Sequence, residues 1–313
     1  MRPTEGYSVD PDLAGLLAAV GEAGAEVDAP YWDDPGVDWS AYDLVVIRST
    51  WDYCERPEEF VAWAERCGEA TRLANPVEVV RWNADKRYLG ELAEGGVPTV
   101  PTWFVGLGEG AVGPVGEGFE GLEEFKEFVV KPTSGNGARY AARYGAGDGD
   151  AARRHVARLH AEGLTAMVQP YVRAVDVTGE RALVFFGGRF LHAVRKGAVL
   201  APGVAYDAAK VAHPGRRAWV PSAGELALAE RALGAVPGGE GLLYARVDVV
   251  DGEGGLCVME VELVEPNLFL SVCPGAFRVV GEGVVGVALR GSFRQSRPFP
   301  NPLTRLVLKR RTG

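Results

Sequence analysis

The feature that most constrains the fold is a pair of apolar, alternating segments separated by a glycine-rich turn. The segments are Leu243–Val250 and Leu256–Val264, and the turn between them reads Asp-Gly-Glu-Gly-Gly. Side chains alternate between the two faces of a β-strand, and turns of this composition join antiparallel strands. The pattern therefore predicts an antiparallel β-hairpin that is largely buried.

The hairpin carries four charged residues in strands that are otherwise apolar. Arg246 and Asp248 share one face of the first strand. Glu260 and Glu262 share one face of the second. Three carboxylates on a mostly buried hairpin repel one another unless a cation joins them, and carboxylate oxygens are ligands that Mg²⁺ prefers. A solvent-facing polar stripe is the alternative for any single acid, but for the four residues together we favour a metal site.

Length and charge limit the classes of partner. The chain has 313 residues, which is enough for about two domains, and a formal net charge of −9 argues against nucleic acid or an anionic membrane as a main partner. No apolar run has transmembrane length, and the N-terminus lacks the pattern of a signal peptide. The four cysteines lack zinc-ligand spacing, so we expect reduced thiols and a cytoplasmic protein. A homodimer is the default oligomer.

Helical and strand patterns alternate along the chain, as in an α/β protein. Helices are expected at residues 12–24, 58–67, 84–93, 150–162, 223–235 and 275–289, and strands at DLVVI, FVVK, TAMVQ and the pair RALVFF and RFLHAVRK. No apolar run precedes the first helix. Either the N-terminal sheet lacks an expected strand or the chain starts late.

A glycine-rich loop follows one of the buried strands. The segment FVVKPTSGNG places Lys131 at the strand end and puts Ser134, Gly135, Asn136 and Gly137 in the loop. Glycines let backbone N–H groups approach an anion, and a neighbouring lysine neutralises phosphate charge. The lysine precedes the glycines, so this is not a Walker A loop. A structural hairpin turn explains the same pattern equally well.

A second candidate ligand-binding segment is MVQPYV. It ends a strand at a Gln-Pro break, where backbone groups can hydrogen-bond a purine. Asp176 and Glu180 follow as candidate acceptors for ribose hydroxyls, although each taken singly also fits an exposed loop.

Together these segments resemble the ATP-grasp superfamily. The matching motifs, in order, are WNADK, VVKPTSGNG, MVQPYV, GERALVFFGGRFLHAVRK, YARVDVV and MEVELVEP, over roughly residues 83–270. RSTWDY, RWNADKRYL, FLHAVRK and EVELVEPNLF are similar to the branch with the cyclising ligase of D-cycloserine biosynthesis. The resemblance implies an α/β (α+β) fold in which two ATP-grasp lobes sandwich ATP, preceded by a small α/β pre-ATP-grasp domain. The implied boundaries are 1–82 for that substrate domain, 83–168 for the small lobe, 169–291 for the large lobe and 292–313 for a tail.

The resemblance also implies roles for individual residues. Contacts to the ATP phosphates would come from Lys86, Lys131 and the loop Ser134–Gly137. The adenine pocket would be lined by Gln169, Tyr171 and Val172, and the ribose would be bound by Asp176 or Glu180. The transferred phosphoryl group would lie near Lys196 and Arg246. Mg²⁺, as two ions for which Mn²⁺ could substitute, would be held by Asp248, Glu260 and Glu262. Many ATP-grasp enzymes have Glu-x-Asn where this chain has Glu260-Val-Glu262.

The substrate side is assigned to the motif RSTWDY, which follows the strand DLVVI. Ligands of open α/β sheets collect beyond the carboxyl ends of strands. Substrate contacts are therefore expected from Arg48, Ser49, Thr50, Trp51 and Asp52. Interdomain packing is the alternative for the aromatic residues.

The expected activity is that of an ADP-forming ligase. The enzyme would activate a small, amino-acid-like or peptide-like carboxylate as an acyl phosphate, which an amine or another nucleophile then attacks. Two alternatives remain at this stage. One is a phosphotransferase on the same fold, and the other is a nucleotide-binding module without catalysis.

Overall fold

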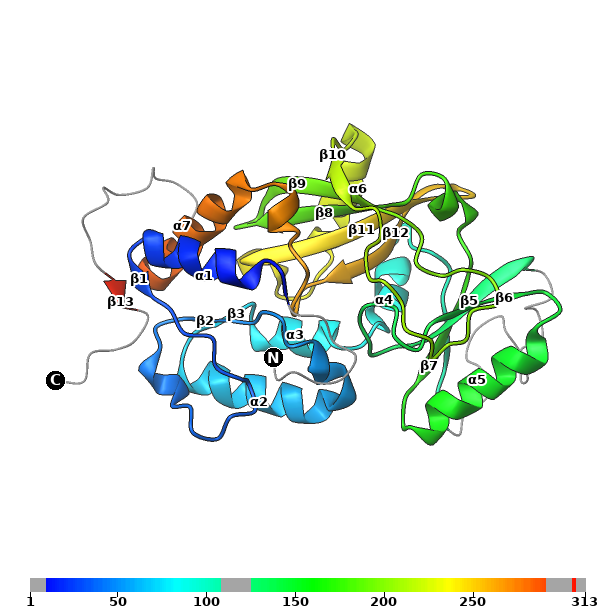
Figure 1. Cartoon of the computed structure of the whole chain (residues 1–313), viewed down its shortest axis with the longest axis horizontal. Coiled ribbons are helices and arrows are strands. Elements are labelled where there is room, and N and C mark those ends of the chain that lie inside the picture. The colour runs from blue at the N-terminus through cyan, green and yellow to red at the C-terminus, as the bar shows by residue number, and fades with distance from the viewer. Residues whose placement is uncertain (1–9, 108–124, 291–305, 308–313) are drawn as a thin grey trace.

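The computed structural model describes residues 10–107, 125–290 and 306–307, and within them the chain is a mixed α/β protein (Figure 1). Its described strands form four sheets, two of them with two strands, one with four and one with five. The expected α/β architecture is confirmed. The question of a strand before the first helix falls on residues outside the described ranges.

The N-terminal part is a small α/β unit. It contains α1 (Leu13–Glu22), β1 (Ala25–Glu26), β2 (Val45–Val46), α2 (Pro57–Ala70) and β3 (Leu73–Ala74), with short 3₁₀ helices at Trp39–Ala41 and Trp51–Glu55. β2 and β3 pair in parallel, and β1 pairs in parallel with β13 (Leu306–Val307). α2 starts with Pro57, whose missing N–H would have no helical partner at this position. Two glutamates in the first turn place negative charge at the positive end of the helix dipole.

Helix α1 packs closely on the last helix, α7 (Gly275–Arg290), beside it in Figure 1. Leu16 and Val20 of α1 share an apolar core with Val280 and Val284 of α7. A Cβ atom at Gly281 would lie 2.6 Å from the Ala19 carbonyl oxygen, so this approach requires a glycine. The first and last helices of the described chain therefore brace each other.

The helix expected at 84–93 begins later in the structure, as α4 (Tyr88–Glu94), and a helix that was not expected, α3 (Val77–Asn83), precedes it. A break at residues 84–87 separates the two helices. The Asn83 amide donates to the Val261 carbonyl at 2.8 Å and accepts from the Leu263 N–H at 2.7 Å. Asp85 accepts from the Arg87 N–H, and the Lys86 N–H donates to the Thr133 carbonyl. The backbone N–H of Lys86 is thus bonded outside the helices, and Lys86 lines a cavity.

The small lobe is a four-stranded antiparallel sheet covered by one helix. Its elements are β4 (Trp103–Val105), β5 (Glu127–Pro132), β6 (Ala142–Gly145), α5 (Gly149–Ala161) and β7 (Ala166–Pro170). The apolar face of α5 contributes Val156 and Leu159 to a core with Phe128 and Val168.

The large lobe is a five-stranded antiparallel sheet. Its elements are β8 (Glu180–Phe186), β9 (Arg189–Lys196), β10 (Arg217–Trp219), α6 (Ala223–Gly234), β11 (Tyr244–Gly252) and β12 (Gly255–Glu262), with 3₁₀ helices at Arg173–Asp176, Gly239–Gly241 and Leu270–Val272. A capping box between Ser222 and Glu225 starts α6. The predicted hairpin is confirmed as β11 and β12, in which Arg246 lies opposite Glu262 and Asp248 opposite Glu260.

The buried side-chain amide of Asn75 links the N-terminal unit to this hairpin. The Asn75 side chain donates to the carbonyls of Tyr244 and Leu263, at 2.9 and 2.8 Å, and accepts from the Leu243 N–H at 2.8 Å. The amide contacts backbone groups beside both strands that carry the charged residues.

Among the helices that the structure describes, none is both long enough and apolar enough to span a membrane.

Candidate active site

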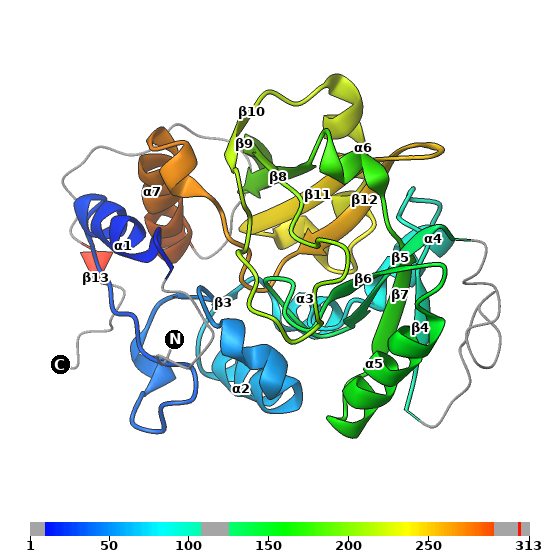
Figure 2. The ribbon, with the colours of Figure 1, turned by 45° about the vertical axis from the view of Figure 1, so that its right-hand side comes forward.

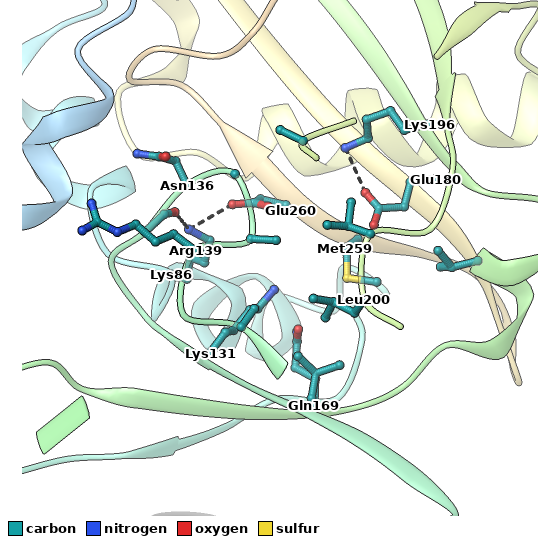
Figure 3. A pocket seen from close by; sticks show the side chains of 18 of the residues that line it. Lys86, Lys131, Asn136, Arg139, Gln169, Glu180, Lys196, Leu200, Met259 and Glu260 are labelled. Atoms are coloured by element: carbon teal, nitrogen blue, oxygen red, sulfur yellow. Dashed lines mark hydrogen bonds and ion pairs between the residues drawn. The ribbon is translucent and has the colours of Figure 1, made fainter. Parts of the chain in front are cut away.

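A cavity of about 150 Å³ lies between the two lobes. In Figure 2 the small-lobe sheet lies below and to the right of the large-lobe sheet. The wall includes the strand end of β5, the glycine-rich loop, the end of β7, and charged residues of β8, β9, β11 and β12. Figure 3 shows several of the charged side chains pointing into this space.

Three carboxylates form a compact cluster on the hairpin face. Oxygens of Asp248, Glu260 and Glu262 all lie within 4.8 Å of one another. Burial raises the pKa of Glu262 to about 7, with Glu260 adding to the effect and Arg246 opposing it. A divalent cation would relieve the repulsion that otherwise favours a proton here, and a cluster of carboxylate oxygens suits Mg²⁺. The residues therefore fit a metal site of the predicted kind.

Arg246 and Asp248 form a fully buried ion pair next to the cavity. Arg246 is 1% exposed and makes a two-pronged contact with Asp248, at 2.9 Å from Nε to Oδ1 and 3.1 Å from Nη2 to Oδ2. Its guanidinium also contacts Glu262 and donates to the Asn267 carbonyl. Burial alone would raise the pKa of Asp248, but Arg246 and Lys196 hold that pKa well below its usual range. The carboxylate is thus fixed in its ionised, ligand-competent form.

Two of the three lysines in the cavity wall are paired. Lys196 Nζ lies 2.5 Å from Asp248 and 2.9 Å from Glu180. Lys86 Nζ lies 3.1 Å from Glu260 and donates to the Gly135 carbonyl at 2.5 Å (Figure 3).

Lys131 differs from the other two lysines. Within the described ranges it has no hydrogen bond or ion pair, although its side chain reaches into the cavity (Figure 3). Burial lowers its pKa, and the attraction of Glu260 does not offset that effect. A cavity with a desolvated, unpaired ammonium on one side and a carboxylate cluster on the other suits a polyanion with a bound divalent cation.

The glycine-rich loop lies against the N-terminal unit. Gly135, Asn136 and Gly137 are in the cavity wall. The Asn136 amide donates to the Trp51 carbonyl at 2.5 Å, and Arg139 pairs with Glu55. The two segments RSTWDY and SGNG are therefore brought together. Ser134 is buried outside the wall, and its hydroxyl finds no partner in the part of the chain described.

The end of β7 forms the opposite wall. Gln169, Tyr171 and Val172 all line the cavity, and the Gln169 amide donates to the Thr102 hydroxyl at 2.8 Å. The two ribose candidates are separated by the structure, since Glu180 lies in the wall and Asp176 lies outside it. Asp176 is bound by Arg143 at 3.2 Å and by the Tyr171 hydroxyl at 2.5 Å.

The RSTWDY residues are beside the cavity but not in its wall. The Arg48 guanidinium pairs with Asp10 at 3.3 Å and donates to the Pro266 carbonyl, and the Ser49 hydroxyl also donates to Asp10. Asp52 accepts from the Trp32 indole at 3.3 Å. Three of the predicted substrate residues, Arg48, Ser49 and Asp52, thus have structural partners. Trp51 contacts the glycine-rich loop through its carbonyl, and the Thr50 hydroxyl is buried without a partner among the described residues.

Two further residues line this region and were not predicted. His213 belongs to the segment that joins β9 to β10, lies in the cavity wall and meets the Phe269 ring edge-on at 5.0 Å. Glu265 lines a smaller cavity of about 20 Å³ beyond the carboxylate cluster. The sequence signal for Glu265 was present, because it is the third acid of MEVELVEP, but strand periodicity ends before it.

Comparisons with known proteins identify the family. Residues 2–75 match the family model of the N-terminal domain of D-cycloserine synthetase DcsG. The chain is 41% identical over 271 residues to the cycloserine biosynthesis protein DcsG of Streptomyces lavendulae, with 84% of this chain and 89% of that protein covered. It superposes on a crystal structure of D-cycloserine synthetase DcsG with a TM-score of 0.80 and 37% identity, covering 90% of this chain and 95% of that one.

A more distant solved structure supports the fold. The D-alanine–D-alanine ligase of Bacillus anthracis, solved with ATP, matches with a TM-score of 0.52 and 14% identity over 80% of each chain. The resemblance inferred from the motifs is therefore confirmed. The chain belongs to the ATP-grasp ligases, in the same family as D-cycloserine synthetase, and it is an enzyme of ATP-dependent ligation.

Proposed function

We propose that this ligase closes the five-membered ring of D-cycloserine, or of a near analogue, from a linear D-serine derivative that carries nitrogen on its side-chain oxygen. The observation that supports this most is the match to D-cycloserine synthetase over nine-tenths of the chain. The charges around the cavity fit the first half of such a reaction, which brings a carboxylate up to a triphosphate.

The reaction consists of two bond exchanges. An oxygen of the substrate carboxylate attacks the γ-phosphorus of ATP, the bond to the β–γ bridging oxygen breaks, and ADP leaves. The side-chain nitrogen then attacks the acyl carbon, and the bond from that carbon to the phosphate oxygen breaks. Phosphate leaves with the bonding electrons and accepts the proton that nitrogen loses. Because nucleophile and carboxylate belong to one molecule, the second exchange gains from proximity.

The phosphates are bound from the small-lobe side in this proposal. Lys131 has an unpaired ammonium in the wall, and Lys86 reaches the same space from the break between α3 and α4. Gly135–Gly137 supply backbone N–H groups close to the cavity. An unpaired ammonium gains more from a phosphate than one that already has a carboxylate partner. Lys131 is accordingly the strongest phosphate contact.

The reacting end lies at the hairpin. Asp248, Glu260 and Glu262 would hold Mg²⁺, with two ions expected and Mn²⁺ able to replace them. Bound Mg²⁺ neutralises and aligns the phosphates for transfer. Arg246 and Lys196 keep Asp248 ionised and add positive charge where the phosphoryl group moves.

The remaining assignments concern the substrate and the assembly. Gln169, Tyr171 and Val172 would face adenine, and Glu180 would bind the ribose. The division into a substrate domain (1–82), a small lobe (83–168), a large lobe (169–291) and a tail (292–313) stays a proposal, as does a homodimer. The N-terminal unit would complete the substrate site through the loop that Asn136 holds against Trp51.

The test is a turnover assay with purified full-length protein, ATP and Mg²⁺. The substrates are O-amino-D-serine and its N-carbonyl derivatives, with D-serine and D-alanine for comparison. We expect equal amounts of ADP and phosphate, together with a cyclic product identified by mass and by comparison with D-cycloserine. A linear dipeptide, or a stable phosphorylated product, as the main outcome would contradict the ring-closure proposal.

A further inference from the structure

Glu265 is a buried carboxylate for which the described chain supplies no partner. The residue is 7% exposed and follows the end of β12 by three positions. Neither a hydrogen bond nor an ion pair connects it to another described residue, whereas Asp248, Glu260 and Glu262 each pair with a cation. A carboxylate taken out of water without a partner is costly, and a bound cationic group removes that cost.

The cations that act most strongly on Glu265 are paired with other carboxylates. The charges that act on it most are Glu262, Arg48, Arg246 and Lys86. Arg48 pairs with Asp10, and Arg246 pairs with Asp248. Lys86 pairs with Glu260. None of the three directs a hydrogen bond at Glu265, so a cationic group of a bound ligand would meet no competing partner among the described residues.

The position of Glu265 identifies the substrate side of the site. The smaller cavity shares Lys86, Gly135, Asn136, Glu260 and Glu262 with the nucleotide cavity. Glu265 and Tyr53 line only the smaller one. A group bound there lies beyond the carboxylate cluster as seen from the nucleotide. In the proposed function, the carboxylate that attacks the γ-phosphate would lie on this side of the cluster.

A third metal ion is a poor candidate for the missing cation. The group of acids whose oxygens lie within 4.8 Å of one another consists of Asp248, Glu260 and Glu262, and Glu265 is not part of it. One carboxylate with a tyrosine and an asparagine nearby, Tyr53 and Asn83, supplies few anionic ligands for a divalent ion. It is better suited to an ammonium group, which needs one carboxylate and neutral acceptors.

We propose that Glu265 binds the α-ammonium group of the substrate and so restricts this ligase to α-amino acids. The inference rests on the proposed function, in which the α-carboxylate of the same substrate is activated at the hairpin. The ammonium and the carboxylate are separated by one carbon atom. Binding the ammonium group at Glu265 therefore places the substrate carboxylate next to the cluster of Asp248, Glu260 and Glu262.

The experiment measures carboxylate activation separately from ring closure. Hydroxylamine traps acyl phosphates as hydroxamates, so ADP release can be followed with O-amino-D-serine, with D-serine and with the matching acids that lack the amino group. Each is assayed with the unaltered chain, with Glu265→Gln, with Glu265→Asp and with Glu253→Gln. Glu253 is exposed in the turn of the same hairpin and serves as the matched control.

We expect Glu265→Gln to raise KM for the amino acids at least about 10-fold, because a charge-assisted hydrogen bond is lost. KM for ATP should stay within about twofold of its original value. The acids without an amino group should react alike with Glu265→Gln and with the unaltered chain. Glu265→Asp should recover part of the loss, and Glu253→Gln should behave as the unaltered chain.

Three results would overturn the inference. The first is an unchanged KM for the amino acids, with only kcat reduced. The second is that the unaltered chain uses the acids without an amino group as well as it uses the amino acids. This comparison involves no variant, so misfolding of a variant cannot affect it. The third is an equal loss for both substrate classes. If hydroxamate forms from the amino acids but no ring appears without hydroxylamine, the proposed function fails while the KM comparison still decides the role of Glu265.

Discussion

Replacing Lys131 by methionine should have opposite effects on the free protein and on its nucleotide complex. In the free protein the ammonium is partly buried and unpaired within the described chain, and burial lowers its pKa. Removing a poorly compensated charge while keeping the side-chain volume should raise the free energy of unfolding by about 1 kcal/mol. For a chain of 313 residues that corresponds to a Tm increase of about 2 °C.

The nucleotide complex should lose more than the free protein gains. A charge-assisted hydrogen bond to a phosphate is worth about 1.5–3 kcal/mol, so Kd for Mg-ATP should rise about 10- to 150-fold. With nucleotide at about 100 times the original Kd, the unaltered chain gains about 2.7 kcal/mol. A variant with a 100-fold weaker Kd gains only about 0.4 kcal/mol at the same concentration.

Thermal unfolding with and without Mg-ATP measures both effects. The unaltered chain should show a nucleotide-induced Tm shift of about 5 °C, and Lys131→Met a shift of about 1 °C from a slightly higher starting value. Lys126→Met is the matched control, since Lys126 is exposed just before the same strand. A lower Tm for free Lys131→Met, together with an undiminished nucleotide shift, would refute the phosphate assignment.

Three further predictions concern the hairpin, the domain contact and the small lobe. Glu260→Gln should reduce kcat more than about 100-fold by removing a metal ligand, with unchanged far-UV circular dichroism; near-normal turnover would exclude Glu260 from the metal site. Asn75→Ala should cost about 3 kcal/mol in urea unfolding, because three hydrogen bonds from the Asn75 side chain to backbone groups at the hairpin are lost; a loss below about 1 kcal/mol would contradict that role. Burial lowers the pKa of His155 to about 4, so the folded protein keeps this imidazole neutral at pH values where the unfolded chain protonates it. The free energy of unfolding should therefore fall as the pH falls from about 6.5 to 4. That loss is about 3 kcal/mol and should be absent in His155→Phe, and an unchanged pH slope in the variant would exclude His155 as the cause.

Local patterns predicted the elements whose hydrogen bonds are local. Alternating apolar residues and a glycine-rich turn were sufficient for β11 and β12, and the Gly-Gly pair was sufficient for β8 and β9. The same alternation predicted that Arg246, Asp248, Glu260 and Glu262 lie together, because register fixes which side chains share a face.

Features that depend on distant partners were not predicted. The break between α3 and α4 exists because the Asn83 amide bonds the hairpin backbone, a contact that helical periodicity cannot indicate. His155 of α5 is 2% exposed and its ring stacks on Tyr206 at 4.4 Å, a contact with a distant segment that the sequence of the helix does not indicate. Arg48 suits a carboxylate ligand by residue type, yet its partner is Asp10, 38 positions earlier in the chain.

The most direct test of the account follows one oxygen atom. The unaltered chain is given ATP, Mg²⁺ and O-amino-D-serine with oxygen-18 at both carboxylate oxygens, and the released phosphate is analysed by mass spectrometry. Attack of the carboxylate on the γ-phosphorus predicts one labelled oxygen in each phosphate released, with ADP as the nucleotide product. Unlabelled phosphate, or label in AMP, would contradict activation through an acyl phosphate.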